Sequence, residues 1–184
     1  MISATVATMS SADAVELPKA FAALGWPGKG AGLYRRYLAE HHDGVRVALV
    51  ASVGSQVAGY VTVLWRSGYL PFREAGIPEV QDLNVLPQFR RQHVGTALLD
   101  AAESAIKTRH DVAGLGVGLY GDYGPAQLMY LERGYRPDGR GLAYRFTTVS
   151  PGATVPVDDD LNLMMTRALT SAVRGPGSGT GHGG

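Results

Sequence analysis

Residues 83–103 read LNVLPQFRRQHVGTALLDAAE. This stretch predicts the end of a strand, a proline-initiated turn over 87–93 and a helix over 94–108. The apolar face of that helix is formed by Ala97, Leu98, Ala101, Ala105 and Ile106. The first N–H groups of a helix have no partner within it, and the helix dipole adds partial positive charge there, so a diphosphate fits. Arg90 and Arg91 can add charge-assisted contacts to phosphate, although a pair of arginines before a helix is more often solvated surface.

Outward from this loop, the pattern predicts a mixed sheet with helices on both faces. The first part of the chain is expected to form a strand over 2–9, a helix over 12–24 capped by Ser10 or Ser11, a loop over 25–32 and a helix over 33–41. A hairpin of 45–53 and 57–65, an ordered loop over 66–78 and a strand over 80–86 then lead to the turn at 87–93. After it we expect a strand over 112–120, a helix over 126–133, a turn over 135–140 and strands over 142–148 and 160–169. We interpret 1–170 as a single domain and 171–184 as a flexible tail rich in glycine and serine.

Composition narrows the function classes. The chain has 184 residues with 45% hydrophobic and 18% charged content, which is typical of a globular domain. A formal net charge of +1 gives no reason to expect nucleic acid or a membrane as partner. The chain has no cysteine, which excludes disulfides, thiolate metal sites and a cysteine nucleophile. The histidines show no metal-ligand spacing, and we expect a cytoplasmic protein without a signal peptide.

The loop also carries a family motif. The stretch 83–103 resembles the acetyl-CoA-binding motif of the GNAT superfamily of N-acetyltransferases, whose signature is Arg/Gln-x-x-Gly-x-Gly/Ala between a strand and a helix. One alignment reads Arg90-x-x-His93-x-Gly95, in which His93 departs from the expected glycine. A shifted alignment, Gln92-x-x-Gly95-x-Ala97, matches fully. Both alignments assign the same stretch to the cofactor.

A second segment matches at the expected distance. Residues 118–141, GLYGDYGPAQLMYLERGYRPDGRG, resemble the superfamily's Asn-x-x-Ala-x-x-Leu-Tyr-x-x-x-Gly-Phe helix, with Ala126, Tyr130, Gly134 and Tyr135 in place, Tyr123 at the asparagine position and Met129 at the leucine position. The resemblance is sharp over 79–136 and implies an α/β (α+β) fold with a mostly antiparallel, twisted sheet of about six to seven strands. It also implies acetyl-CoA as cofactor and direct attack of an amine on its thioester.

The resemblance assigns roles to individual residues. Those expected to bind the cofactor are Leu83, Asn84, Val85, Arg90, Arg91, Gln92, His93, Val94, Gly95, Thr96, Ala97, Tyr123, Ala126 and Tyr130. Tyr130 matches the tyrosine that protonates the departing thiolate. Glu79 is the first candidate for the base, because it matches a strand position where members commonly carry a basic glutamate. Asp82 is the second, provided that a bulge turns it to the same face. The alternative roles are a packed aromatic for Tyr130 and a solvated residue for Glu79.

The acceptor is open at this point. Trp65, Tyr69 and Phe72 lie in the loop that precedes the strand of Glu79, where an aromatic-rich segment can border a small amine or pack on the core. We expect a small-molecule amine. A protein or peptide acceptor, and a non-catalytic acyl-CoA sensor on the same fold, are the alternatives, and a homodimer stays open.

Overall fold

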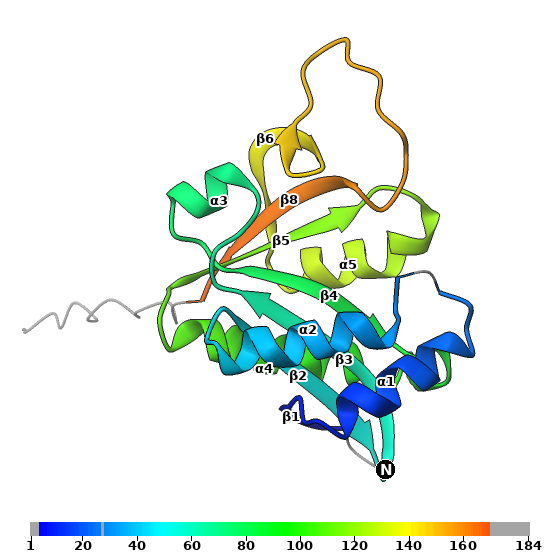
Figure 1. The fold of residues 1–184 in the computed structure, drawn as a ribbon. Coiled ribbons are helices and arrows are strands. Elements are labelled where there is room, and N and C mark those ends of the chain that lie inside the picture. The colour runs from blue at the N-terminus through cyan, green and yellow to red at the C-terminus, as the bar shows by residue number, and fades with distance from the viewer. Residues whose placement is uncertain (1–3, 27, 170–184) are drawn as a thin grey trace, which may run out of the picture.

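The structure is a computed structural model that describes residues 4–26 and 28–169. Its centre is an eight-stranded sheet in the order β1-β2-β3-β4-β5-β8-β6-β7 (Figure 1). The strands are β1 Thr5–Thr8, β2 Arg46–Val53, β3 Gln56–Leu64, β4 Glu79–Val85, β5 Val112–Gly118, β6 Arg136–Tyr144, β7 Thr147–Thr148 and β8 Leu161–Ala168. Every neighbouring pair is antiparallel except β4 and β5. The predicted mixed, mostly antiparallel sheet is confirmed, with one more strand than the upper expectation.

Helices cover both faces of the sheet, as predicted. They are α1 Asp13–Ala22, α2 Ala31–His42, α3 Leu70–Glu74, α4 Val94–Lys107 and α5 Gly124–Glu132, with short 3-10 turns at Pro87–Phe89 and Gly121–Tyr123. Figure 1 shows α1 and α2 in front of β2 and β3, and α4 behind them. The apolar face of α4 is fully covered, with Leu98, Leu99, Ala102 and Ile106 each 0% exposed. These side chains belong to the main core, which also includes the inner residues of β2 and β3.

Three sequence predictions were wrong in detail. The loop predicted over 66–78 contains α3, because Pro71 suits a first helical turn and Phe72 anchors it in the interior. All of the turn predicted over 135–140 except its first residue lies within β6, which is bulged between Pro137 and Leu142. Glycines with positive φ in that bulge, at 139 and 141, look like turn residues in sequence. The strand predicted over 142–148 is interrupted by a turn at Arg145 and Phe146, which separates the end of β6 from β7.

Two further predictions concern the cap of the first helix and the C-terminal tail. Ser10 was predicted as one of two helix caps, and its hydroxyl accepts a hydrogen bond from the Asp13 N–H at 3.2 Å, although the residue directly before α1 is Ala12. The tail predicted over 171–184 lies outside the described residues.

The parallel strands β4 and β5 stay paired over a short distance only. Their pairs are Glu79 with Gly114 and Val80 with Leu115, whereas β4 continues to Val85 and β5 to Gly118. From Gln81 onward the edge of β4 that faces β5 therefore has no strand partner. Strand β4 leads along this open edge directly into the turn before α4, so the fold places the predicted loop next to unpaired strand backbone.

Candidate active site

The turn before α4 is held in an unusual backbone conformation. After the 3-10 turn Pro87–Phe89, both Arg91 and His93 adopt positive φ, at 58° and 60°, and α4 begins at Val94. Non-glycine residues in this region carry strain and cluster at functional sites. His93 stands where the first alignment of the GNAT motif expects glycine, so its left-handed conformation favours the reading Arg90-x-x-His93-x-Gly95 over the shifted one.

Successive amides in this turn point to no protein acceptor. Within the described residues, the backbone N–H groups from Arg91 to Thr96 make no hydrogen bond of good geometry, and the first one that does is that of Ala97, which donates to the His93 carbonyl at 2.9 Å. Six free donors in a row at the positive end of a helix dipole are what binding of an anion requires. This arrangement fits the diphosphate of a nucleotide cofactor.

The side chains around the turn leave its amides open. Arg90 and Arg91 are exposed, and Arg90 Nε donates to the Val85 carbonyl at 3.3 Å while its guanidinium lies 5.7 Å from the Trp26 ring centre. Gln92 donates to the carbonyl of Gln88 at 2.8 Å. Of the other predicted cofactor residues here, Val94 is buried, and Leu83, Val85, Gly95, Thr96 and Ala97 are half-buried.

Gly95 faces the open edge of β4. A Cβ atom added there would meet the Met129 Sδ and Val85 Cγ2 atoms at 3.7 Å each, which is ordinary contact. The space between Gly95, Met129 of α5 and Val85 of β4 therefore has room for a methyl group but not for a larger side chain. A long side chain at this position would fill the space between these elements.

Tyr130, on α5, is buried but has a free hydroxyl. The residue is 7% exposed, its ring lies 5.8 Å from that of Tyr135, and burial raises its pKa to about 12. Within the described residues, the one fully buried side-chain polar atom without a partner is the Tyr34 hydroxyl. The Tyr130 hydroxyl makes no hydrogen bond there either, so it retains contact with the surface. It is therefore free to donate its proton to a bound group.

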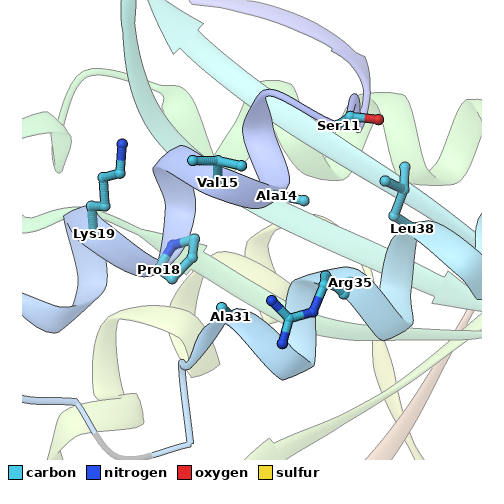
Figure 2. Close-up of a pocket in the computed structure, with 8 residues that line it drawn as sticks. All are labelled: Ser11, Ala14, Val15, Pro18, Lys19, Ala31, Arg35 and Leu38. Carbon is cyan, nitrogen blue, oxygen red and sulfur yellow. The ribbon is translucent and has the colours of Figure 1, made fainter.

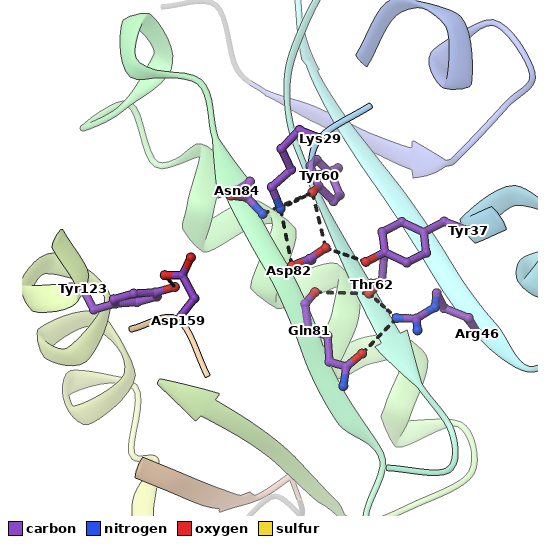
Figure 3. Close-up of polar contacts among 10 residues, drawn as sticks. All are labelled: Lys29, Tyr37, Arg46, Tyr60, Thr62, Gln81, Asp82, Asn84, Tyr123 and Asp159. Atoms are coloured by element: carbon purple, nitrogen blue, oxygen red, sulfur yellow. Dashed lines mark hydrogen bonds and ion pairs between the residues drawn. The ribbon is translucent and has the colours of Figure 1, made fainter. Parts of the chain in front are cut away.

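Tyr123 lies across the open edge from β4. Its ring lies directly over Gly118, where an added Cβ would approach the ring to 2.4 Å. Its hydroxyl donates to the Asp159 carboxylate at 2.9 Å (Figure 3). Ala126, also predicted to bind the cofactor, packs against the edge of the core. The family motif has an asparagine at the position of Tyr123. The Tyr123 hydroxyl could donate to the cofactor in its place only by giving up its hydrogen bond to Asp159.

A bulge in β4 settles the orientation of Asp82. The register against β3 shifts between Tyr60 and Thr62, and Asp82 has a φ of 52°. As a result two consecutive side chains lie on the same side of the sheet: Gln81 accepts a hydrogen bond from Arg46 of β2 at 3.1 Å, and Asp82 accepts one from Tyr37 of α2 (Figure 3). The bulge on which the second base candidate depended is therefore present.

The two candidate bases differ in exposure. Glu79 is 4% exposed, lies where β4 and β5 are still paired, and accepts a hydrogen bond from the Ser67 hydroxyl. Burial raises its pKa above the usual value, against the smaller opposing effects of that hydrogen bond and of Arg46. The side chain of Asp82 is 33% exposed and lies beyond the last β4–β5 pair. Of the two, Asp82 is the carboxylate that an incoming molecule can touch.

Asp82 belongs to a polar cluster that we name the lysine cluster: Lys29, Tyr37, Tyr60, Asp82 and Asn84 (Figure 3). Lys29 Nζ donates to the Tyr60 hydroxyl at 2.8 Å and lies 3.5 Å from Asp82 Oδ1. Asn84 Nδ2 donates to the same tyrosine oxygen at 3.3 Å. The sequence reasoning missed Lys29, Tyr37 and Tyr60, because they come from three segments and form no local motif.

The predicted acceptor-binding aromatics lie elsewhere. Tyr69 is 1% and Phe72 2% exposed, and both pack in a small second core with Ala143 and Met164. Trp65 is half-buried, with the Arg109 guanidinium 4.4 Å from its ring centre, beyond the C-terminal end of α4. The structure does not bring these three side chains together with the loop before α4. All three pack against the protein core, which was the alternative to a place in the acceptor site.

A groove between α1 and α2 contains none of the predicted site residues. It is lined by Ser11, Ala14, Val15, Pro18, Lys19, Ala31, Arg35 and Leu38 (Figure 2). Across residues 4–26 and 28–169, no three histidine or acidic side chains gather in a way that could hold a metal ion. In the same residues no helix combines the length and hydropathy needed to cross a membrane.

Solved structures share this fold across nearly the whole chain. An assigned GNAT acetyltransferase from Desulfovibrio desulfuricans has a TM-score of 0.68 at 14% identity, covering 91% of this chain and 100% of its own. Ard1 from Thermoplasma volcanium has a TM-score of 0.66 at 19% identity, covering 92% and 100%. An aminoglycoside 6'-N-acetyltransferase complexed with coenzyme A has a TM-score of 0.61 at 15% identity, covering 91% and 98%. At these identities the likeness shows the fold alone.

Comparison of the sequence with protein families identifies the family of the chain. No curated protein matches the chain. The family model described as "Acetyltransferase (GNAT) domain" matches residues 44–137, which is half of the chain and includes β4, the turn with free amides and α5. Acetyl-CoA is the cofactor of this family, as the two sequence motifs implied. The chain belongs to the GNAT family of acetyltransferases.

Proposed function

We propose that the protein is an N-acetyltransferase that moves an acetyl group from acetyl-CoA to the primary amine of a small molecule. The observation that carries this proposal is the run of unpartnered amides from Arg91 to Thr96 beside the open edge of β4, with the free hydroxyl of Tyr130 nearby on α5. Two structural neighbours that act on small amines support the choice of acceptor, the aminoglycoside enzyme and a spermidine N-acetyltransferase chimera.

The cofactor would be held by backbone more than by side chains. The amides of residues 91–96 would bind its diphosphate, and the exposed Arg90 and Arg91 would add charge. Unpaired backbone groups of β4 around Leu83 and Val85 would bind its pantetheine arm as an added strand would. When bound, the cofactor supplies an activated acetyl thioester.

Asp82 would take the proton from the acceptor amine. Its carboxylate is partly exposed and lies beside the open edge, whereas that of Glu79 is buried and hydrogen-bonded to Ser67. This preference reverses the order expected from the sequence, and its reason is access. Glu79, with its raised pKa, would serve as a proton reservoir deeper in the sheet rather than touch the amine.

Tyr130 would act as the acid. Because burial raises its pKa to about 12, the hydroxyl keeps its proton throughout the neutral range. A phenol that is protonated and makes no hydrogen bond to the protein can donate to a departing thiolate without first breaking another bond. The proton held at Tyr130 Oη would thus be delivered to sulfur.

An amine screen tests the proposal. The purified chain is incubated with acetyl-CoA and a panel of polyamines, aminoglycosides and amino acids, and released thiol is measured. Gly95→Glu, whose side chain would fill the space near Met129 and Val85, should abolish acetyl-CoA binding by calorimetry. Gly32→Glu is the matched control, since Gly32 is exposed in the first turn of α2 with no neighbouring atom within 4 Å.

The outcomes separate the alternatives. Thiol release with small amines, lost in Gly95→Glu and kept in Gly32→Glu, supports the proposal. Acetyl-CoA binding without thiol release from any amine or peptide would contradict it and point to a sensor. Release with peptides alone would contradict the small-molecule acceptor.

A further inference from the structure

Lys29 places an amine of the protein itself at the proposed active site. Its ammonium nitrogen lies 2.8 Å from the Tyr60 hydroxyl, 3.5 Å from Asp82 Oδ1 and 5.4 Å from the Tyr60 ring centre. The side chain is 16% exposed, so these contacts hold it against the sheet rather than in solvent. Figure 3 shows it reaching across to β4 near Asp82 and Asn84, which lie in the part of the strand beyond its last pair with β5.

The surroundings of this nitrogen are those that an amine substrate needs. A carboxylate neutralises the ammonium and can accept its proton, the Tyr60 hydroxyl accepts a second N–H and so fixes the orientation of the nitrogen, and an aromatic face stabilises the cation. The ion pair joins the loop before α2 directly to the candidate base.

The other lysines are placed differently. The chain has three lysines, Lys19, Lys29 and Lys107. Lys19 lies on α1 with 64% of its side chain exposed and pairs with Glu16. Lys107 is exposed at the end of α4, the end away from the turn with free amides. Simple chemical acetylation follows exposure, so it would modify Lys19 and Lys107 in preference to Lys29.

We propose that Lys29 is an internal acceptor, which the protein acetylates in its own active site when acetyl-CoA is bound and no other amine competes. This inference rests on the proposed function. In the step, the Lys29 ammonium gives one proton to Asp82, and Nζ forms a bond to the acetyl carbonyl carbon. The bond from that carbon to the CoA sulfur breaks, and the sulfur takes a proton from Tyr130. As the amide forms, Nζ loses its second proton, which returns through water to the Tyr130 oxygen. The products are Nε-acetyl-Lys29 and free CoA, and the proton on Asp82 is released to water.

Acetylation of Lys29 would change the site. An amide is neutral and cannot pair with Asp82, so the carboxylate would become free to receive an external ammonium. The unmodified Lys29, in contrast, occupies the place that an external amine must take. The modification would therefore convert a site that is blocked by its own lysine into one that is open.

Site-resolved mass spectrometry tests the proposal on the full chain. Purified protein is incubated with acetyl-CoA alone, and the fraction of each lysine that carries an acetyl group is followed over time. We expect Lys29 to be modified first and to near completion, with a rate constant independent of protein concentration, as an intramolecular reaction requires. Tyr130→Phe should slow the modification of Lys29 by about 100-fold and leave the slow reaction of Lys19 unchanged.

Two variants serve as matched controls. Lys29→Arg keeps the positive charge beside Asp82 but removes the nucleophile, so the acetyl group should be missing from its peptide. Lys19→Arg should leave the modification of Lys29 as it is in the unaltered protein. Melting curves of both variants show whether they are folded.

The results distinguish this inference from the proposed function. Acetylation of Lys19 and Lys107 at least as fast as that of Lys29 would overturn it. A Lys29 that stays unmodified with acetyl-CoA alone, in a protein that releases thiol once a small amine is added, would overturn it as well. In the second case the proposed function would stand. If acetyl-CoA did not bind at all, both would fall.

Discussion

Replacing Gly59 by alanine tests whether the shape of β4 is set by its close approach to β3. Gly59 pairs with Val85, one residue beyond the bulged part of β4. A Cβ atom there would lie 2.3 Å from the Asn84 carbonyl oxygen and 3.1 Å from Val85 Cα. Both neighbours are backbone atoms, which cannot rotate away as a flexible side chain could.

The size of the effect follows from these contacts. Because real Cβ atoms essentially never approach another atom more closely than 3.0 Å, the Asn84 carbonyl has to move from 2.3 Å to beyond that limit. Overpacking of this kind costs about 1–3 kcal/mol. Each kcal/mol lowers the melting temperature of a chain of this size by about 2–4 °C. The displaced residues lead directly into the turn before α4, so acetyl-CoA affinity should fall as well.

Calorimetry of unfolding and of acetyl-CoA binding measures both effects. Gly32→Ala is the control, because a Cβ there meets open space and alanine in a helix is favoured by about 0.5–1 kcal/mol over glycine. We expect a lower melting temperature and weaker binding for Gly59→Ala alone. A Gly59→Ala protein with the melting temperature and affinity of the unaltered chain would refute the reasoning.

Three further predictions concern single side chains. Tyr130→Phe should lower kcat by about 100-fold or more while acetyl-CoA affinity by calorimetry stays the same; an unchanged kcat would remove its role as acid. Burial raises the pKa of Glu79 above 4.5, so in the folded state this carboxyl keeps a proton that it loses in the unfolded state. The protonated Glu79 therefore contributes fully to stability below pH 4.5, and this contribution is lost as pH rises through the raised pKa. Glu79→Gln should remove that slope from urea unfolding measured across pH, and a slope that persists would contradict it. Glu103, which is 7% exposed and pairs with Arg133 and Arg167, joins α4 to the end of α5 and to β8. Glu103→Gln should destabilise the chain by about 3–5 kcal/mol in urea, and a loss under 1 kcal/mol would show that the network is dispensable.

The strand, turn and helix around residues 83–103 were predictable because their signals are local. Proline, small residues and the spacing of apolar side chains within one stretch determine where β4 ends and α4 begins. The left-handed conformation of His93 was not predictable, because histidine gives no sign of it. The resemblance alone marked the position as one where glycine is usual.

The lysine cluster was beyond sequence reasoning for a different reason. Lys29 and Tyr60 are 31 residues apart, and Tyr37 and Asp82 are 45 apart. Their contact depends on how α2 crosses the sheet and on the bulge at Asp82, which turns a side chain to the face opposite to the one that strand alternation predicts. The burial of Tyr69 and Phe72 was equally hard to predict, since a glycine- and proline-rich segment looks open in sequence although both rings pack in the second core around α3.

Binding of the cofactor's diphosphate would depend most on the amides from Arg91 to Thr96. Their NMR signals in the ¹⁵N-labelled protein test it directly when coenzyme A is added. We predict that these amide protons shift downfield more than those of any other segment, because they gain charged acceptors that they now lack. If coenzyme A binds while these six signals stay in place, the turn before α4 does not hold the diphosphate.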